Sequence, residues 1–348
     1  MIGDDILVTT AAVLLTLAAV TLVVWLGHAA WFTVRERRVA ALRPPALQAL
    51  ATAIRDADSA PAIAALETLN RDARTGAVVG MAFTVAGDQR ERLNALVRET
   101  GIWTRATGWA TSRLWTRRLR AARLFALFGS GSETQGERLL DDPRPEVRAQ
   151  ASEWAGEHPT PARADRMVRM LADADPRCRF AARDALIRTG RGAIPPIRER
   201  LDARDGALPD LLAVAAALAV PEFLPAGIAL CGSQDPAIRA RAATLAGAVG
   251  GPDAVAALTD LLRDPSMRVR VAAVQGLGSL GHWQAAGAVS ELLEDENWSV
   301  RRAAALALDR MGPTGALLLN RAARGGNHAT ADTARYALGL EPLLSGEA

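Results

Sequence analysis

Residues 276–281 read GLGSLG, and this spacing of three glycines could bind a dinucleotide. In dinucleotide sites, glycines that follow a strand let the backbone approach a pyrophosphate at the start of a helix. The residues just before the glycines, MRVRVAAV, could form such a strand. A nucleotide-binding enzyme is therefore the first hypothesis to test against the rest of the chain.

Other residues that could carry chemistry are few and scattered. The two cysteines, Cys178 and Cys231, have neither metal-site spacing nor the pattern of a disulfide framework. No Ser/His/Asp, Cys/His or paired-carboxylate set can be assigned to one place. We therefore expect a protein that is not an enzyme and that has no metal and no cofactor. The four histidines leave little material for a metal centre: His28, His158, His282 and His328.

Composition favours closely packed helices. Half of the residues are hydrophobic but only 4% are aromatic, so the core must be built from Ala, Leu and Val. All 41 basic residues are arginine, and the net charge is only +3. This balance is weak support for a nucleic-acid partner.

A long uncharged stretch lies near the N-terminus. Residues 6–27 form an apolar run of 22 residues, which as a helix would span roughly 33 Å, enough for a bilayer core. Arginines follow it in RERRVAALR, whereas Asp4 and Asp5 precede it. The positive-inside rule then predicts a transmembrane helix over residues 6–32, with the N-terminus outside and the remainder in the cytoplasm. The competing interpretation is a cleaved signal peptide, but that would need positive charge before the run.

Beyond residue 113 the sequence repeats with a period near 31 residues. The pattern is a Val, Ile or Cys followed directly by Arg, with Ala three residues after that Arg. It recurs at intervals of 31, 60, 31 and 31 residues. The interval of 60 contains one degenerate unit near Leu208. A sustained period of this length predicts a solenoid of helix–turn–helix units. The positions that define the period are Val147, Cys178, Ile238, Val269 and Val300.

The period offers another explanation for GLGSLG. Glycine stands twelve residues after most of the repeat positions, where a helix would end with a positive φ. Gly281 is one of these, whereas Gly276 and Gly278 fall inside the predicted helix. We therefore expect no nucleotide site, and Gly276→Ala to be tolerated or to stabilise by up to about 1 kcal/mol. The predicted helix stops are Gly129, Gly190, Gly250, Gly281 and Gly312.

Arginine and aspartate also recur with the period. A charged pair in every unit predicts a ladder of ion pairs between repeats, and the alternative is a stripe of arginines that binds phosphate. The arginines are Arg148, Arg179, Arg239, Arg270 and Arg301. The aspartates are Asp142, Asp175, Asp235, Asp264 and Asp295.

The unit resembles the HEAT repeat, in particular the short bacterial type called HEAT_2 or PBS-lyase-like, through its signature D-P-x-x-V-R-x-x-A-x-x-A-L-G over residues 113–341. The resemblance implies that second helices line a concave face. The chain contains no His-Glu pair of the kind that HEAT-type di-iron hydroxylases use. From this resemblance we predict a partner-binding face made of Arg120, Arg123, Gln150, Glu153, Asp184, Arg241, Gln275 and Arg302.

The whole layout resembles a bacterial family of membrane-anchored HEAT-repeat proteins, mainly through RLWTRRLRAARLFALFG at residues 113–129. Members of that family associate with membrane glycosyltransferases of extracellular-polysaccharide synthesis. The resemblance alone therefore implies such a glycosyltransferase as the protein partner.

These observations predict an all-α fold, with an N-terminal transmembrane helix followed by an α-solenoid of HEAT-like helix pairs. The expected function is that of a scaffold that binds a protein at the cytoplasmic face of the inner membrane, with no small-molecule ligand. A nucleic-acid-binding HEAT-like protein and a PBS-lyase-like enzyme remain the alternatives. The predicted segments are an outside N-terminus (1–5), the transmembrane helix (6–32), a basic linker (33–43), a helical cap or degenerate repeats (44–112), the solenoid (113–341) and a tail (342–348).

Overall fold

The computed structural model describes residues 44–56, 58–129, 133–325 and 327–339. Every regular element within these ranges is a helix, which confirms the all-α class. The predicted transmembrane helix, the segments on either side of it and the tail over residues 342–348 lie outside the described residues. In the part of the chain that is described, no helix is both long and apolar enough to cross a membrane.

The chain divides into two compact units, residues 1–135 and residues 136–348. The predicted border between cap and solenoid, at residues 112 and 113, falls inside the first unit. The first unit consists of a helix over residues 44–56, α2 (Ala60–Glu67), α3 (Arg71–Ala82), α4 (Asp88–Glu99), α5 (Ile102–Ala110) and α6 (Trp115–Phe128).

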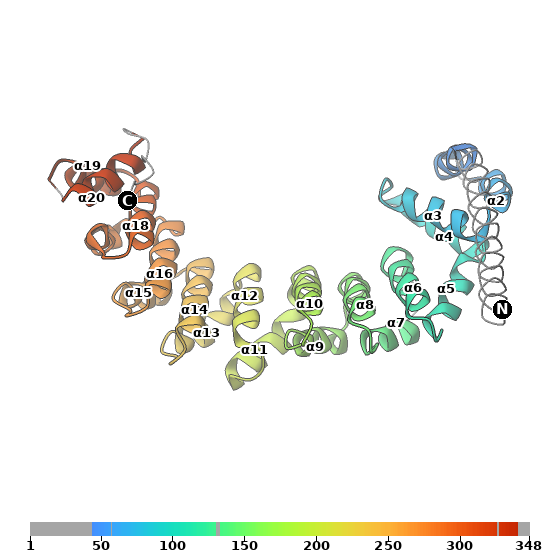
Figure 1. Cartoon of the computed structure of the whole chain (residues 1–348), viewed down its shortest axis with the longest axis horizontal. Coiled ribbons are helices and arrows are strands. Elements are labelled where there is room, and N and C mark those ends of the chain that lie inside the picture. Colours follow the sequence, from blue (N-terminus) through green and yellow to red (C-terminus); the bar gives the residue numbers. More distant parts are fainter. Residues whose placement is uncertain (1–43, 57, 130–132, 326, 340–348) are drawn as a thin grey trace, which may run out of the picture. The chain divides into compact units, whose positions relative to one another are not determined.

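The second unit is built from helix pairs, as predicted for a solenoid. Figure 1 shows the second helices of the pairs following one another along one row, with the first helices beside them on the other side. Each second helix contacts the second helix of the next pair. The first helices are α7 (Glu133–Leu140), whose first three residues belong to the first unit, α9 (Pro161–Met170), α11 (Ile194–Ala203), α13 (Leu224–Leu230), α15 (Pro252–Leu261), α17 (Ala286–Glu291) and α19 (Pro313–Gly325). The second helices are α8 (Pro145–Glu157), α10 (Pro176–Thr189), α12 (Leu208–Leu218), α14 (Pro236–Val249), α16 (Met267–Ser279), α18 (Trp298–Arg310) and α20 (His328–Ala337).

Small and branched residues form the core of this unit. Val147, Cys178, Val269 and Val300 are completely buried, as the repeat predicts, and Ile238 is half-buried. The alanine four residues later in each unit is buried as well, at 0–1% exposure. Because alanine has only a methyl group, the backbones of neighbouring second helices can lie close together. The members of this alanine set are Ala151, Ala182, Ala242, Ala273 and Ala304.

The helix ends combine aspartate caps at some helix starts with glycine at the predicted stops. Asp175 and Asp235 cap α10 and α14 by accepting hydrogen bonds from backbone N–H groups in the first turn. At the other end, four of the predicted stop glycines have φ between 60° and 76°, a region that favours glycine. Gly129 is the exception, because its φ is −33°. The prediction of a positive φ is wrong at that position.

GLGSLG is the end of a helix and not a strand followed by a turn. The last residues of α16 include Gly276 and Gly278, and Gly281 follows with a φ of 60°. Both Gly276 and Gly278 lie where α16 packs tightly against its neighbours. A Cβ at Gly276 would lie 3.0 Å from the Leu258 side chain and 3.2 Å from the Cα of Gly247. A new methyl group would fit only if the Leu258 side chain moved by a few tenths of an ångström, so the small gain in stability expected for Gly276→Ala stays a prediction.

Candidate functional site

The turns that precede the five repeat positions have two polar residues each, which the sequence pattern did not separate. The ladder position is the fifth residue before the repeat position, and the cap position is the third. Within one turn, Asp173 occupies the ladder position and Asp175 the cap position. The predicted set of aspartates mixes the two, because Asp235 also occupies a cap position, whereas Asp142, Asp264 and Asp295 occupy ladder positions.

Ladder aspartates bind the arginine of the preceding unit. The Arg270 guanidinium donates to both carboxylate oxygens of Asp295 at 2.8 and 2.9 Å, and its Nη1 donates to the Asp264 backbone oxygen at 3.0 Å. The Arg239 guanidinium binds Asp264 in the same way, at 2.7 and 2.8 Å. An equivalent pair joins Arg148 to Asp173. The predicted ladder between repeats is therefore confirmed for three arginines, with Asp173 in place of Asp175.

The ladder is interrupted at α11 and α12. Position 203, where Arg179 would find its carboxylate, is Ala203, so its Nη1 donates only to the backbone oxygens of Asp173 and Ala174. In the same unit, Pro209 replaces the repeating arginine. An ion pair between Arg183 and Asp210 joins α10 to α12 instead.

The ladder arginines are occupied and poorly exposed, which favours a structural role over a phosphate-binding stripe. The side chains of Arg148, Arg239 and Arg270 are 11–20% exposed, and each already binds a carboxylate with two nitrogens. Such bidentate pairs fix the geometry of both partners. The ladder therefore sets the register between repeats and leaves little capacity for a ligand.

The ladder carboxylates predict a loss of stability in acid. Burial alone would raise the pKa of Asp264, but hydrogen bonds from Arg239 and from the Ser266 N–H outweigh it and leave the pKa lowered. The ionised Asp264 carboxylate therefore stabilises the folded state. This stabilisation is fully present above the pKa of the unfolded chain, about 3.9, and is lost as pH falls through the lower pKa of the folded state. We expect the free energy of unfolding to fall from pH 6 to pH 3 by less in Asp264→Asn than in the wild type, measured by urea unfolding. An equal fall in both proteins would contradict this role.

The thiols have no features of catalytic nucleophiles. Burial raises the pKa of Cys231 to about 11, and the pKa of Cys178 is raised by the same cause. Both groups therefore stay protonated near neutral pH, whereas a reactive cysteine needs a lowered pKa. Cys178 Sγ instead lies 3.3 Å from the Pro145 backbone oxygen and contributes to the core between α8 and α10.

The residues predicted to bind a partner are distributed over α6 of the first unit and five second helices of the second unit. Arg120 and Arg123 are exposed on α6 of the first unit, where Arg120 pairs with Asp72 at 3.3 Å. In the second unit, Gln150 hydrogen-bonds Glu153 on α8. Asp184 on α10 pairs with Arg188 at 2.7 Å.

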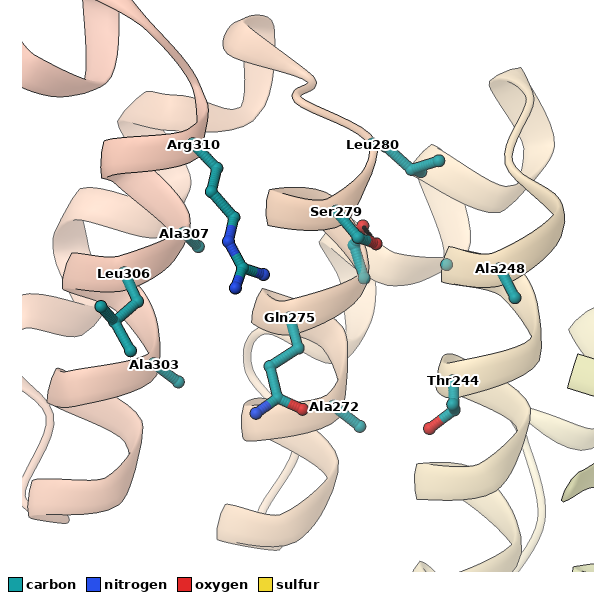
Figure 2. Close-up of a pocket in the computed structure, with 12 residues that line it drawn as sticks. Thr244, Ala248, Ala272, Gln275, Ser279, Leu280, Ala303, Leu306, Ala307 and Arg310 are labelled. Atoms are coloured by element: carbon teal, nitrogen blue, oxygen red, sulfur yellow. Dashed lines mark hydrogen bonds between the residues drawn. The ribbon is translucent and has the colours of Figure 1, made fainter. Parts of the chain in front are cut away.

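The remaining predicted residues, Arg241, Gln275 and Arg302, are exposed on α14, α16 and α18. These three neighbouring helices share a groove of about 630 Å³, which Gln275 lines. In Figure 2 the Gln275 side chain and the Arg310 guanidinium extend toward the space between α16 and α18. Arg241 precedes the groove residue Thr244 by three residues, and Arg302 precedes Leu306 by four. Both arginines therefore lie one helical turn from the groove.

The groove has an apolar floor and polar edges. Ala272, Ala303 and Leu306 supply apolar surface between the helices, and Gly247 and Gly276 lie where α14 and α16 come closest. The polar lining consists of Thr244, Gln275, Ser279 and Arg310. The volume falls within the usual range for ligand pockets, about 300–1,000 Å³.

Sequence reasoning missed Arg310, Ser279 and Leu306 as groove residues. Their signal was present in the period, because Ser279 and Arg310 occupy the tenth position after the repeat residue, and Leu306 occupies the same position as Gln275. Gly276 and Ser279 also show that part of GLGSLG lines the groove. It does so from the end of a helix, without the strand and helix start that a dinucleotide site requires.

Comparison with known families identifies HEAT repeats in the second unit. Residues 261–339 match the HEAT_2 family of HEAT repeats. This range includes α16 and α18, and with them two of the groove's helices. No curated protein matches the chain.

Solved structures resemble the chain in fold. Kap95p, solved in a complex with RanGDP, has 12% identity and a TM-score of 0.51 over 84% of this chain, and the chain spans 49% of Kap95p. An engineered protein has 18% identity and a TM-score of 0.39, covering 88% of this chain and 95% of that one. The CpcE–CpcF complex of phycocyanin lyase from Nostoc sp. has 17% identity and a TM-score of 0.34, covering 62% of this chain and 91% of that one.

Proposed function

We propose that this chain is a scaffold without enzymatic activity that binds another protein along the row of second helices. The observation that supports this most is the groove of α14, α16 and α18, where exposed polar side chains surround an apolar floor. Stacked helix pairs suit this role, because they present an extended surface whose exposed positions can vary without disturbing the core. The ladder keeps the positions of neighbouring pairs fixed relative to one another.

The proposal includes a tether to the membrane. The apolar run over residues 6–32 and the arginines after it favour a single-pass anchor, with the helix pairs in the cytoplasm. Such an anchor would raise the local concentration of a membrane-bound partner. A membrane glycosyltransferase of extracellular-polysaccharide synthesis is the partner that we propose, on the resemblance of the layout alone.

Site-specific photocrosslinking tests where the partner binds. A benzophenone side chain at position 275 on α16 is expected to form covalent adducts with one membrane protein in intact cells. The same side chain at position 260, which is exposed on α15 in the other row, is the matched control. Equal adducts at both positions, or none at position 275, would contradict a partner on this row. Release of the chain from membranes without detergent would contradict the tether.

A further inference from the structure

The second helices differ in charge along the second unit. Together α14, α16 and α18 contain seven arginines and one acidic residue, Asp309. Asp309 is not among the residues that line the groove. In contrast, α8 contains Glu146, Glu153 and Glu157 against a single arginine. The α10 helix also contains four arginines against one acidic residue, Asp184, but Arg177, Arg183 and Arg188 are each paired with a carboxylate. The last three long helices of the row therefore differ from α8 in net charge and from α10 in how many of their arginines are paired.

Four of the seven arginines are not used by the ladder. Arg239 and Arg270 bind aspartates, and Arg301 donates to the backbone oxygens of Asp295 and Glu296. The other four are exposed, and none of them has a carboxylate partner within the described residues. Arg302 lies over the Trp298 ring, 5.5 Å from its centroid, so its position is set by an aromatic ring and not by an anion. These four are Arg241, Arg268, Arg302 and Arg310.

The positive charge meets the apolar floor at the groove itself. Arg310 lines the groove beside Leu306 and Ala307, and Figure 2 shows its guanidinium extending over the space toward α16. Arg241 and Arg302 stand one turn away, at the N-terminal side of the groove. The Gln275 amide makes no hydrogen bond to another described residue, so it is available to a ligand backbone. An occupant of this groove must therefore supply both apolar surface and negative charge.

We propose that the groove of α14, α16 and α18 binds an acidic peptide segment of the protein partner, with small or aliphatic side chains on the floor and carboxylates at Arg310, Arg241 and Arg302. The proposal rests on the scaffold function and names the chemistry of its partner. Guanidinium groups bind carboxylates with two parallel hydrogen bonds, which gives orientation as well as attraction. The side-chain amide of Gln275 can donate to and accept from an extended backbone.

The same surface fits nucleic acid poorly. A nucleic acid needs a continuous line of cations along its backbone, and single strands also need aromatic platforms for their bases. The groove has no aromatic lining residue. Along the row, Glu153 and Asp184 interrupt the positive charge at α8 and α10. The observations thus favour a short acidic peptide over a phosphate backbone.

The test is selection from a library of random dodecapeptides on the full chain in detergent. Peptides that combine two or more Asp or Glu with Leu, Val or Ala are expected to be enriched. The binding of a selected peptide, measured by fluorescence anisotropy, should weaken by at least about tenfold in Arg310→Glu, and it should also weaken in Arg241→Glu. The control is Arg263→Glu in the turn after α15, whose side chain is 85% exposed and lies 3.9 Å from the Glu291 carboxylate, outside the groove.

Three results would overturn the proposal. They are the absence of acidic enrichment, an equal loss in Arg263→Glu, and tighter binding of oligo-dT or of phosphatidylglycerol vesicles than of any selected peptide. A second peptide selection on the Arg310→Glu variant gives an independent readout. The peptides that this variant enriches should contain more Lys or Arg than those selected on the wild type. If crosslinked adducts still form at position 275 but the selection does not enrich acidic peptides, the scaffold function would be supported. Only the proposal that the partner segment is acidic would then be wrong.

Discussion

Replacing Arg270 by alanine is expected to lower the free energy of unfolding by about 3 kcal/mol, because the change leaves a buried carboxylate without its partner. The Asp295 side chain is 6% exposed, and Arg270 donates to both of its oxygens. The same guanidinium also holds the backbone oxygens of Asp264 and Pro265 in the preceding turn. One substitution therefore removes the connection between the turns before α16 and α18.

The matched control is Arg179→Ala. Arg179 occupies the same repeat position and makes the same pair of backbone hydrogen bonds, but it has no carboxylate partner among the described residues. Losing only these bonds should cost about 1 kcal/mol. Urea unfolding of the full chain measures both losses. Hydrogen exchange should place the Arg270 effect in α16 and α18, because each repeat contacts only its neighbours. Equal losses in the two variants would show that the carboxylate contributes nothing.

The ladder shows what a repeat pattern can and cannot predict. The recurrence of arginine and aspartate was enough to predict ion pairs between units, because a charged group at a fixed position in stacked repeats meets its counterpart in the next repeat. It was not enough to choose between Asp173 and Asp175, which lie two residues apart in one turn. That choice depends on the direction of each side chain. Asp175 points back to its own helix start, whereas Asp173 meets Arg148 of the preceding unit.

The groove was harder to predict than the fold. Gln275, Arg241 and Arg302 were predicted from their exposed positions on second helices, and the structure places them in or beside one groove. Glu153 and Asp184 occupy the same repeat position as Gln275, yet each is acidic, and Asp184 pairs with Arg188 of its own helix. Periodicity identifies which positions are exposed on every repeat. It does not reveal where neighbouring helices leave a hollow, because that depends on how close their backbones come.

Close approach is also why Gly278→Ala should be the more damaging of the two glycine changes within α16, at a cost of about 2–3 kcal/mol. A Cβ at Gly278 would lie 2.7 Å from the Cβ and 2.8 Å from the Cα of Ala307. Relief would require α16 and α18 to move apart. At Gly276 the closest atoms are the ends of the Leu258 side chain at 3.0 Å, which can rotate, so Gly276→Ala should cost less.

Gly287→Ala is the matched control for the glycine prediction. Gly287 lies within α17, in the same unit, and a Cβ there would meet nothing within 4 Å. That change should be neutral or stabilise by up to about 1 kcal/mol, because alanine restricts the unfolded chain. Urea unfolding should therefore rank stability as Gly287→Ala, then Gly276→Ala, then Gly278→Ala. A neutral Gly278→Ala would mean that α16 and α18 lie further apart than described. Because both helices line the groove, the same variant should also weaken the binding of a selected acidic peptide, although residue 278 is not in its lining.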